Sequence, residues 1–381
     1  MNILVITQDY PDAQRSVYTF VKQLVDQFAK QGHSVCVVAP FSIVRNRRFQ
    51  KSKEVQIIDG KYKVTILRPN HLSFSNIKIA GFSPSLFFRS LALNKALHRL
   101  PFKPDVIYSH FWRSGIEIFN YAKSNSIPLF VATGESVLLK DDINPAFNDF
   151  YKYVKGVICV STKNMDESIL NHMTTKEKCI VCPNGVNRNL FYKKDKNECR
   201  KELGFPINAF IVAFCGAFIH RKGVKILSDA IDSLNDVEIK SIFMGRPLEE
   251  LPSCRNIVFQ GPVQHEKLID YLNSADVFVL PTLHEGCCNA IIEAMACGLP
   301  VISFDCENGP RSIVVEGENG FLIPPFCVEQ FADRLIQLIC DKDLRKVMGD
   351  KGKKKSQYYQ IENVGHQWKV LFDELMNKDG V

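Results

Sequence analysis

The amino-acid sequence predicts an α/β protein built from two doubly wound, Rossmann-like domains. Short apolar runs alternate with amphipathic helical patterns through the first half, and the alternation restarts after the turn-rich segment at residues 183–187. Strands that alternate with helices form βαβ units and parallel sheets. The length agrees, because 381 residues at roughly 100–200 per domain suggest two domains.

The first half begins with a strand pattern at Ile3–Thr7. The next segment, Ser16–Lys30, carries apolar residues at a period of 3.6 and predicts a helix that Gly32 terminates. Further strands are predicted at Val35–Ala39, Val64–Leu67, Val106–Ser109, Leu129–Ala132 and Val157–Val160.

The second half repeats the pattern. Strands are predicted at Phe210–Cys215, Ile239–Met244, Ile257–Phe259, Val277–Leu280 and Val301–Ser303, with a helix from Val224 to about Leu234. The chain ends in an amphipathic helix at Ile361–Met376. We therefore expect one domain at 1–183, a second at 184–358, and a C-terminal helix, 359–381, that packs back toward the first domain.

Composition excludes several classes of protein. With 46% hydrophobic and 23% charged residues the chain is typical of globular proteins, and its longest apolar run, Phe210–Ile219, is too short to span a membrane. The N-terminus lacks the basic segment of a signal peptide, so we expect a cytoplasmic protein. Cys179 and Cys182 lack a second ligand pair at zinc spacing, which predicts free thiols beside a buried strand at Ile180-Val181.

Charge is concentrated in the first half. Residues 1–183 hold 24 Lys and Arg against 14 Asp and Glu, a net of +10, whereas the remainder carries −3. The segment Arg45–Lys53 packs five cations around one aromatic residue, and Phe74–Leu100 mixes aromatic with basic residues. Such stretches bind anionic lipid or nucleic acid, or are simply a solvated loop and an ordinary helix.

Ligands of open parallel sheets bind beyond the carboxyl ends of the strands. One such loop, Gly216–Gly223, follows a strand, opens a helix and carries Arg221 and Lys222, which suits a phosphate or two solvated cations equally. It matches neither the Walker A nor the Gly-x-Gly-x-x-Gly pattern. His110–Gly115 and Thr133–Glu135 follow strands of the first half in the same way.

Two glutamates mark another strand end. Glu285 lies in the loop after Val277–Leu280, and Glu293 lies about one turn into the next helix. A carboxylate there can accept hydrogen bonds from two hydroxyls of a sugar or ribose. Glu293 could equally be a buried helix-capping or ion-pairing carboxylate, so the pair alone is a weak signal.

The segment that contains these glutamates resembles the Glu-x7-Glu motif of glycosyltransferase family 4, whose fold is GT-B. The resemblance extends to the flanks, Ala275–Thr282 and Glu293–Ile302. It also includes Val181–Asn187, similar to the family's interdomain Pro-Asn-Gly-Val-Asp, and Gly317–Ile323, similar to its Gly-x-Asn-Gly-Leu/Phe-Leu-Val.

The resemblance implies two domains that face each other across a cleft. It implies a retaining transfer of a hexosyl or N-acetylhexosaminyl group from a nucleotide-diphosphate sugar, with UDP favoured over GDP, to a glycan or lipid-linked acceptor. Neither a cofactor nor a metal is expected. The pathway would be bacterial cell-surface polysaccharide synthesis, such as capsule, exopolysaccharide or lipopolysaccharide. An anionic membrane surface, not nucleic acid, would then be the partner of the basic half.

The family's residue roles carry over to matching positions. Glu285 would face the donor sugar, and Lys222 with Arg221 would neutralise the diphosphate leaving group. Glu293 would hold the ribose. The remaining donor-binding residues would be Gly216, Gly245, Val263, Gly286, Cys288, Asn289 and Ala290, the last three through backbone N–H groups, and the acceptor or sugar side would include His110, Thr133 and Glu135.

Three departures from the family pattern keep alternatives open. Ala217 stands where the family often has Arg, Arg15–Thr19 lacks a Gly-Gly pair, and Thr133-Gly134 replaces His-Gly, so that His110 or Glu135 would have to substitute. A catalytically silent sugar-nucleotide-binding subunit and an enzyme like the UDP-N-acetylglucosamine epimerases are the alternatives.

One metal-site pattern is rejected. The sequence Asp341-Lys342-Asp343 has the Asp-x-Asp form of metal-dependent glycosyltransferases, but it lies between two predicted helices. We expect a helix cap there instead.

Overall fold

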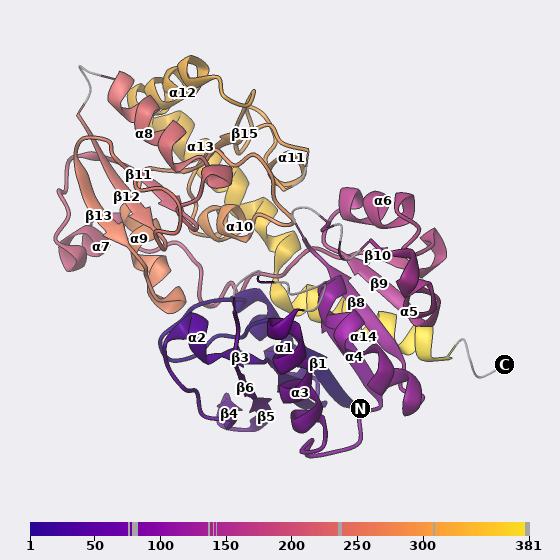
Figure 1. Cartoon of the computed structure of the whole chain (residues 1–381). Helices are drawn as coiled ribbons and strands as arrows, with labels where there is room; N and C mark the ends of the chain where they lie inside the picture. The colour runs from indigo at the N-terminus through magenta and orange to yellow at the C-terminus, as the bar shows by residue number, and fades with distance from the viewer. Residues whose placement is uncertain are drawn as a thin grey trace. The chain divides into compact units, whose positions relative to one another are not determined.

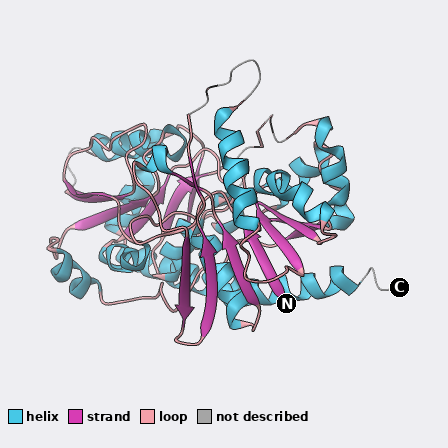
Figure 2. Cartoon of the chain, turned by 60° about the horizontal axis from the view of Figure 1, so that its bottom comes forward, coloured by secondary structure: helices cyan, strands magenta, loops and turns pink. Residues whose placement is uncertain are grey.

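A computed structural model describes residues 1–74, 77, 83–135, 138–139, 141, 143–234, 238–307 and 309–377. They divide into two compact units, residues 1–183 with 364–381, and residues 184–363 (Figure 1). Each unit contains a mostly parallel β-sheet that is flanked by helices (Figure 2). The segment Phe74–Leu100 is predicted to mix aromatic and basic residues. Its residues 75–76 and 78–82 lie outside the described residues.

The first unit is built on eight strands in the order β10-β9-β8-β7-β1-β2-β5-β4, with β3 and β6 paired separately. Only β4 runs antiparallel to its neighbour in this sheet. The strands are β1 (Asn2–Ile6), β2 (Ser34–Val38), β3 (Phe41–Ser42), β4 (Lys53–Ile58), β5 (Tyr62–Leu67), β6 (Asn70–His71), β7 (Val106–His110), β8 (Leu129–Thr133), β9 (Gly156–Cys159) and β10 (Cys179–Val181). The helices are α1 (Thr19–Lys30), α2 (Ile43–Asn46), α3 (Pro84–Leu97), α4 (Trp112–Ser124), α5 (Asn148–Tyr153) and α6 (Thr162–Leu170).

The second unit has six parallel strands in the order β13-β12-β11-β14-β15-β16. They are β11 (Phe210–Cys215), β12 (Ile239–Met244), β13 (Ile257–Gly261), β14 (Val277–Leu280), β15 (Val301–Phe304) and β16 (Gly320–Ile323). The helices are α7 (Lys196–Leu203), α8 (Val224–Ser233), α9 (Leu268–Ser274), α10 (Asn289–Ala296), α11 (Pro310–Ile313), α12 (Val328–Cys340) and α13 (Lys342–Lys355). Strand order reverses between β11 and β14, which makes their carboxyl ends the switch point of this sheet.

The central strands of both sheets confirm the predictions from apolar runs. β11, β12 and β14 have the predicted bounds, and their side chains are almost all buried. The predicted burial of Ile180 and Val181 is wrong: they lie on the edge strand β10 and are 37% and 40% exposed. An edge strand has a neighbour on one side only, so less of its surface is covered.

Helix α14 (Ile361–Asn377) begins in the second unit, and from Val364 onward it belongs to the first. The Trp368 ring lies 4.9 Å from that of Tyr108, and the Phe372 ring lies 5.2 Å from that of Phe130 and 5.7 Å from that of Phe28. This aromatic group closes the core of the first unit.

Other sequence predictions concern helix ends and sulfur. Asp341 caps α13, because its carboxylate accepts a hydrogen bond of 2.8 Å from Leu344 N, as predicted for the Asp-x-Asp segment. All thirteen cysteines are free thiols. Within the described ranges, no helix is long and apolar enough to cross a membrane, and no three His, Cys, Asp or Glu side chains gather as metal ligands would.

Candidate active site

Two loops meet at the switch point of the second sheet. One, Gly216–Gly223, follows β11, and the other follows β14, which pairs directly with β11. Leu283 N donates to Arg221 O at 2.9 Å. Gly223 adopts φ +71°, and a Cβ there would collide with Pro281 O. The chain therefore needs glycine at this position to bring the two loops together.

Glu285 is the electrostatic centre of these loops. Its side chain is nearly buried, and its Oε1 atom accepts hydrogen bonds from Lys222 Nζ and from Thr282 Oγ1, the latter at 2.7 Å. Arg221 lies 3.3 Å from the same oxygen and also donates to His284 O. The predicted catalytic residues are thus brought together, with both cations on one carboxylate oxygen.

Glu293 lies on the buried side of α10 and is only 5% exposed. Its Oε1 lies 2.8 Å from Nε2 of His265, which comes from the loop after β13. The imidazole packs edge-on against Phe191, with ring centroids 5.1 Å apart. The orientation of the Glu293 carboxylate is therefore set by a buried histidine.

The N-terminus of α10 follows Gly286, a buried residue next to Glu285 in the sequence. Of the three backbone N–H groups predicted to approach phosphate, that of Asn289 donates to Cys287 O at 3.1 Å. Those of Cys288 and Ala290 have no main-chain acceptor among the described residues. Free N–H groups and the helix dipole favour an anion at such an end.

The thiols at this end of α10 stay protonated. Burial raises the pKa of Cys287 to about 12 and raises that of Cys288 well above its ordinary value. Burial likewise raises the pKa of Cys215, at the end of β11, to about 12. Because the thiolate is the nucleophilic form, none of these cysteines is suited to attack a substrate.

Gly216 and Gly245 end adjacent strands. Gly216 N donates to Met244 O at 2.9 Å, and Gly245 N donates to Gly261 O at 2.8 Å. A Cβ on Gly245 would collide with Gly216 O, so this glycine is required by the packing of the two backbones. Val263, further along the loop after β13, is half-buried against the core of the unit.

Three residues predicted for the acceptor or sugar side lie in the first unit. Glu135 accepts hydrogen bonds from Thr133 Oγ1 at 2.6 Å, from Gly134 N at 2.9 Å and from Trp112 N at 2.9 Å. Burial raises the pKa of this carboxyl. The Trp112 contact places Glu135 at the N-terminus of α4, a local role that the sequence analysis did not predict.

His110 ends β7, where the strand order of the first sheet reverses, and it is only 2% exposed. Its Nδ1 lies 2.7 Å from Tyr108 Oη, and its ring packs against Phe20 and Phe111. Burial lowers the pKa of His110 to about 3, so the imidazole is neutral at physiological pH. No partner for its Nε2 atom occurs in the described part of the chain.

Two residues that hold the glutamates, Thr282 and His265, were not predicted from the sequence. Thr282 is fully buried and reaches Glu285, three residues away. His265 follows Val263 in the loop after β13, so its place at a strand's carboxyl end was a usable signal. The contact of His265 with Glu293 could not be predicted, because the two residues lie 28 positions apart in the sequence.

Comparisons with known proteins bear on the family and the fold of the chain. Residues 17–190 match the model described as Glycosyltransferase Family 4, and residues 195–355 match Glycosyl transferases group 1. TuaC of Bacillus subtilis (strain 168), whose name assigns a glycosyltransferase to teichuronic acid biosynthesis, is 28% identical over 88% of each chain.

Two solved structures share the fold. Sucrose-phosphate synthase from Thermosynechococcus elongatus superimposes with a TM-score of 0.79 at 19% identity, over 99% of this chain and 100% of that one. Anabaena HepE in complex with UDP and glucose gives 0.75 at 16% identity, over 98% and 100%. The two family matches identify the chain as a glycosyltransferase of the family 4 type, and the two solved structures show that it has the GT-B fold.

Proposed function

We propose that the chain is a retaining glycosyltransferase that moves a sugar from a nucleotide-diphosphate donor to a glycan or lipid-linked acceptor without a metal. The observation that carries the proposal is the convergence of Lys222 and Arg221 on Glu285 at the switch point. Two cations and one carboxylate lie there beside the N-terminus of a helix, which suits a diphosphate next to a sugar.

The chemical task is to stabilise a departing diphosphate. As the bond between the sugar C1 and the diphosphate oxygen breaks, its electron pair stays on that oxygen. Lys222, Arg221 and the N–H groups of Cys288 and Ala290 would oppose the developing charge. The acceptor hydroxyl bonds to C1 on the same face, and its proton passes to the departing phosphate oxygen. No covalent nucleophile is needed, in keeping with the protonated thiols of Cys287 and Cys288.

Glu285 would contact the donor sugar. Its Oε1 contacts Lys222, Arg221 and Thr282, which would leave Oε2 for a sugar hydroxyl. A bound diphosphate would compete with Oε1 for the two cations. Binding of the donor would therefore redistribute positive charge from the carboxylate to the leaving group.

Glu293 would accept hydrogen bonds from the ribose hydroxyls, with His265 fixing the carboxylate. UDP is the favoured nucleotide because HepE, of the same fold, was solved with UDP. A role in cell-surface polysaccharide synthesis, with a hexosyl or N-acetylhexosaminyl donor, is supported by the similarity to TuaC.

We also propose peripheral attachment to an anionic membrane. Arg45, Arg47 and Lys51 form no ion pair in the described part of the chain, and α3 exposes Phe87 and Leu91 at 46% and 51%. Arg48 is not one of these cations without an ion pair, because it lies 2.8 Å from Asp12.

Binding to anionic vesicles should fall with rising salt in co-sedimentation, and fall further when Arg45, Arg47 and Lys51 are replaced by Ser. Equal pelleting with neutral vesicles would contradict attachment through charge.

The enzymatic proposal is tested by donor turnover. Purified protein is incubated with UDP-, GDP- and ADP-sugars, with and without membrane extracts that supply glycan and lipid-linked acceptors, and sugar transfer is followed by mass spectrometry. We expect transfer from one donor class and loss of it in Lys222→Ala. Nucleotide binding without transfer or donor hydrolysis would favour the silent subunit, and a changed sugar epimer would favour the epimerase.

A further inference from the structure

The first unit contains a hollow of about 640 Å³ between α3 and the edge formed by β4 and β5. This volume lies within the range of small-molecule sites. The hollow belongs to neither the switch-point loops nor the strand ends that carry Thr133 and His110. Its lining residues all lie in the described part of the chain.

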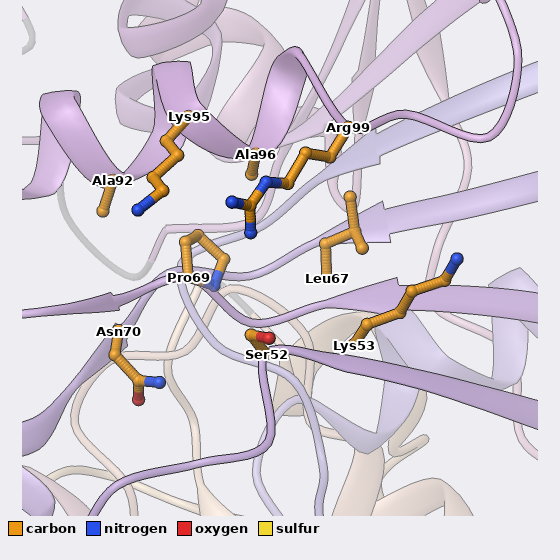
Figure 3. A pocket seen from close by; sticks show the side chains of 9 residues that line it. All are labelled: Ser52, Lys53, Leu67, Pro69, Asn70, Ala92, Lys95, Ala96 and Arg99. Carbon is orange, nitrogen blue, oxygen red and sulfur yellow. The ribbon is translucent and has the colours of Figure 1, made fainter.

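One face of α3 forms a wall of the hollow. Ala92, Lys95, Ala96 and Arg99, the last just beyond the helix end, are spaced three and four residues apart and so project from one side. The two alanines are small enough to leave space below the helix, while the two longer side chains reach across it. In Figure 3 the Arg99 guanidinium points into the hollow above Pro69, and Lys95 Nζ extends toward the strand layer.

The opposite wall is the hairpin of β4 and β5. Lys53 is paired with Leu67 in the antiparallel ladder, and Leu67 is 4% exposed at the floor of the hollow. The side chain of Lys53 runs along the strand layer at the rim (Figure 3). The hollow therefore combines an apolar floor with cations on two sides.

The charge of the hollow is entirely positive. Lys53, Lys95 and Arg99 line it, and no Asp or Glu does. None of the three forms an ion pair or side-chain hydrogen bond within the described ranges. A cation in the last turn of α3 is expected, because the helix dipole favours positive charge there. The dipole explains neither why Lys53, on β4, lies at the same hollow nor why the hollow exists. Three cations without counter-charges around one hollow are complementary to an anion.

We propose that this hollow binds a phosphate ester. Arg99 offers a planar fork of N–H donors that matches two phosphate oxygens, and Lys95 and Lys53 add mobile ammonium groups. The apolar floor at Leu67 and the small Ala92 and Ala96 side chains of the α3 wall accommodate the organic part of the ester. The site is independent of the proposed nucleotide site, whose residues belong to the other unit.

The test compares two double variants of the full chain that lose the same charge, one Lys and one Arg each. Lys95→Gln/Arg99→Gln removes two of the three cations of the hollow, and Arg334→Gln/Lys346→Gln, on α12 and α13 of the second unit, removes cations outside it. Binding of sn-glycerol 3-phosphate is measured by calorimetry. We expect the hollow variant to bind about 25-fold more weakly, about fivefold for each cation, and the control to stay within about twofold. Equal affinities in the two variants would overturn the proposal.

Two further measurements separate the possible outcomes. The charge-preserving variant Lys95→Arg/Arg99→Lys should restore most of the affinity, which a folding defect in the Gln variant would not explain. Vesicles of phosphatidylglycerol or phosphatidylcholine distinguish the source of the ester. A lipid headgroup predicts that the hollow variant loses binding to phosphatidylglycerol by the same factor, whereas a soluble ester predicts no such loss.

Measuring UDP affinity in the hollow variants separates a failure of this proposal from a failure of the proposed function. The hollow variants should bind UDP with unchanged affinity, because Lys222 and Glu293 are untouched. Loss of glycerol phosphate binding with normal UDP binding supports the hollow, whatever the outcome of the transfer assay. Undiminished glycerol phosphate binding in the hollow variant rejects it, even if sugar transfer is found.

Discussion

His265 Nε2 lies 2.8 Å from Glu293 Oε1, and both side chains are nearly buried. The pair links the loop after β13, which carries Val263, to α10, which carries Glu293, and both of these residues are predicted to bind the donor. If Glu293 accepts two ribose hydroxyls, the histidine determines how its carboxylate is presented.

Replacing Glu293 with Ala should weaken binding of the nucleoside diphosphate by about 1.5–3 kcal/mol, because a charge-assisted hydrogen bond is lost. His265→Asn should cause a smaller loss, and His265→Gln, whose longer amide reaches further, should recover part of it. Titration calorimetry checks all three variants. Unchanged affinity in Glu293→Ala would exclude the ribose role.

Replacing Glu285 with Gln should lower kcat more than it raises the donor KM, if the carboxylate acts as charge develops on the sugar. Thr282→Val keeps the carboxylate and removes the hydroxyl that donates to it at 2.7 Å. It should therefore reduce kcat by about tenfold, less than Glu285→Gln. Steady-state kinetics with saturating acceptor measure both effects, and near-normal turnover in Glu285→Gln would remove this residue from the reaction.

A chelator should leave the transfer rate unchanged. In the proposed mechanism Lys222 and Arg221 would supply the positive charge that a divalent cation supplies in other enzymes. The rate is compared before and after dialysis against EDTA, with and without added Mg²⁺ or Mn²⁺. Loss of activity that either metal restores would contradict the proposed metal-free mechanism.

Gly223→Ala should destabilise the protein by more than about 2 kcal/mol, because φ is +71° and the new Cβ would collide with Pro281 O. Gly216→Ala is the matched control in the same loop. Its Cβ would approach Phe214 and Lys222 no closer than 3.5 Å, an ordinary contact. Chemical denaturation should show a clear loss of stability for the first variant only, and equal losses would refute the close approach of the two loops.

His110 should make the protein less stable in acid. Burial lowers its pKa to about 3, whereas the unfolded chain has the ordinary value of about 6.5. Between these values the unfolded state binds a proton that the folded state does not, so stability falls as pH falls. The slope from this residue is about 1.4 kcal/mol per pH unit between roughly pH 6 and 4.

The measurement subtracts the His110→Gln variant from the wild type at each pH, which cancels contributions from other groups such as Glu135. The stability difference should change with pH below 6 and be flat above 7. A difference that stays constant from pH 7 to 4 would show that His110 titrates normally and is not enclosed as described.

Most of the strand framework was predictable, because fully buried parallel strands are continuous apolar runs. β11 and β12 are examples, and each has the bounds that its apolar run predicted. β4 was not predicted. Lys53–Ile58 alternates half-buried with exposed residues at the sheet edge, so its pattern carries little of the core signal.

Site residues that are close to one another in the sequence could be predicted together. Contacts between residues far apart in the sequence could not. Glu285 and Glu293 share one loop and helix, so their neighbourhood followed from the sequence. The pairing of Lys222 with Glu285 joins residues 63 positions apart, and only the adjacency of β11 and β14 brings them into contact. For the same reason the sequence predicts the run Arg45–Lys53 as one cluster, although Arg48 pairs with Asp12 and Lys53 lines the same hollow as Lys95.

Helix α14 has a consequence for how the chain folds during synthesis. The ribosome makes Phe28, Tyr108 and Phe130 long before Trp368 and Phe372, whose rings pack against them. The first unit therefore cannot complete its core until α14 has emerged from the ribosome. The second unit, residues 184–363, is continuous in sequence and has no such dependence. Ribosome-bound chains that stop before residue 364 should thus contain a second unit resistant to proteolysis and a first unit that is still cleaved.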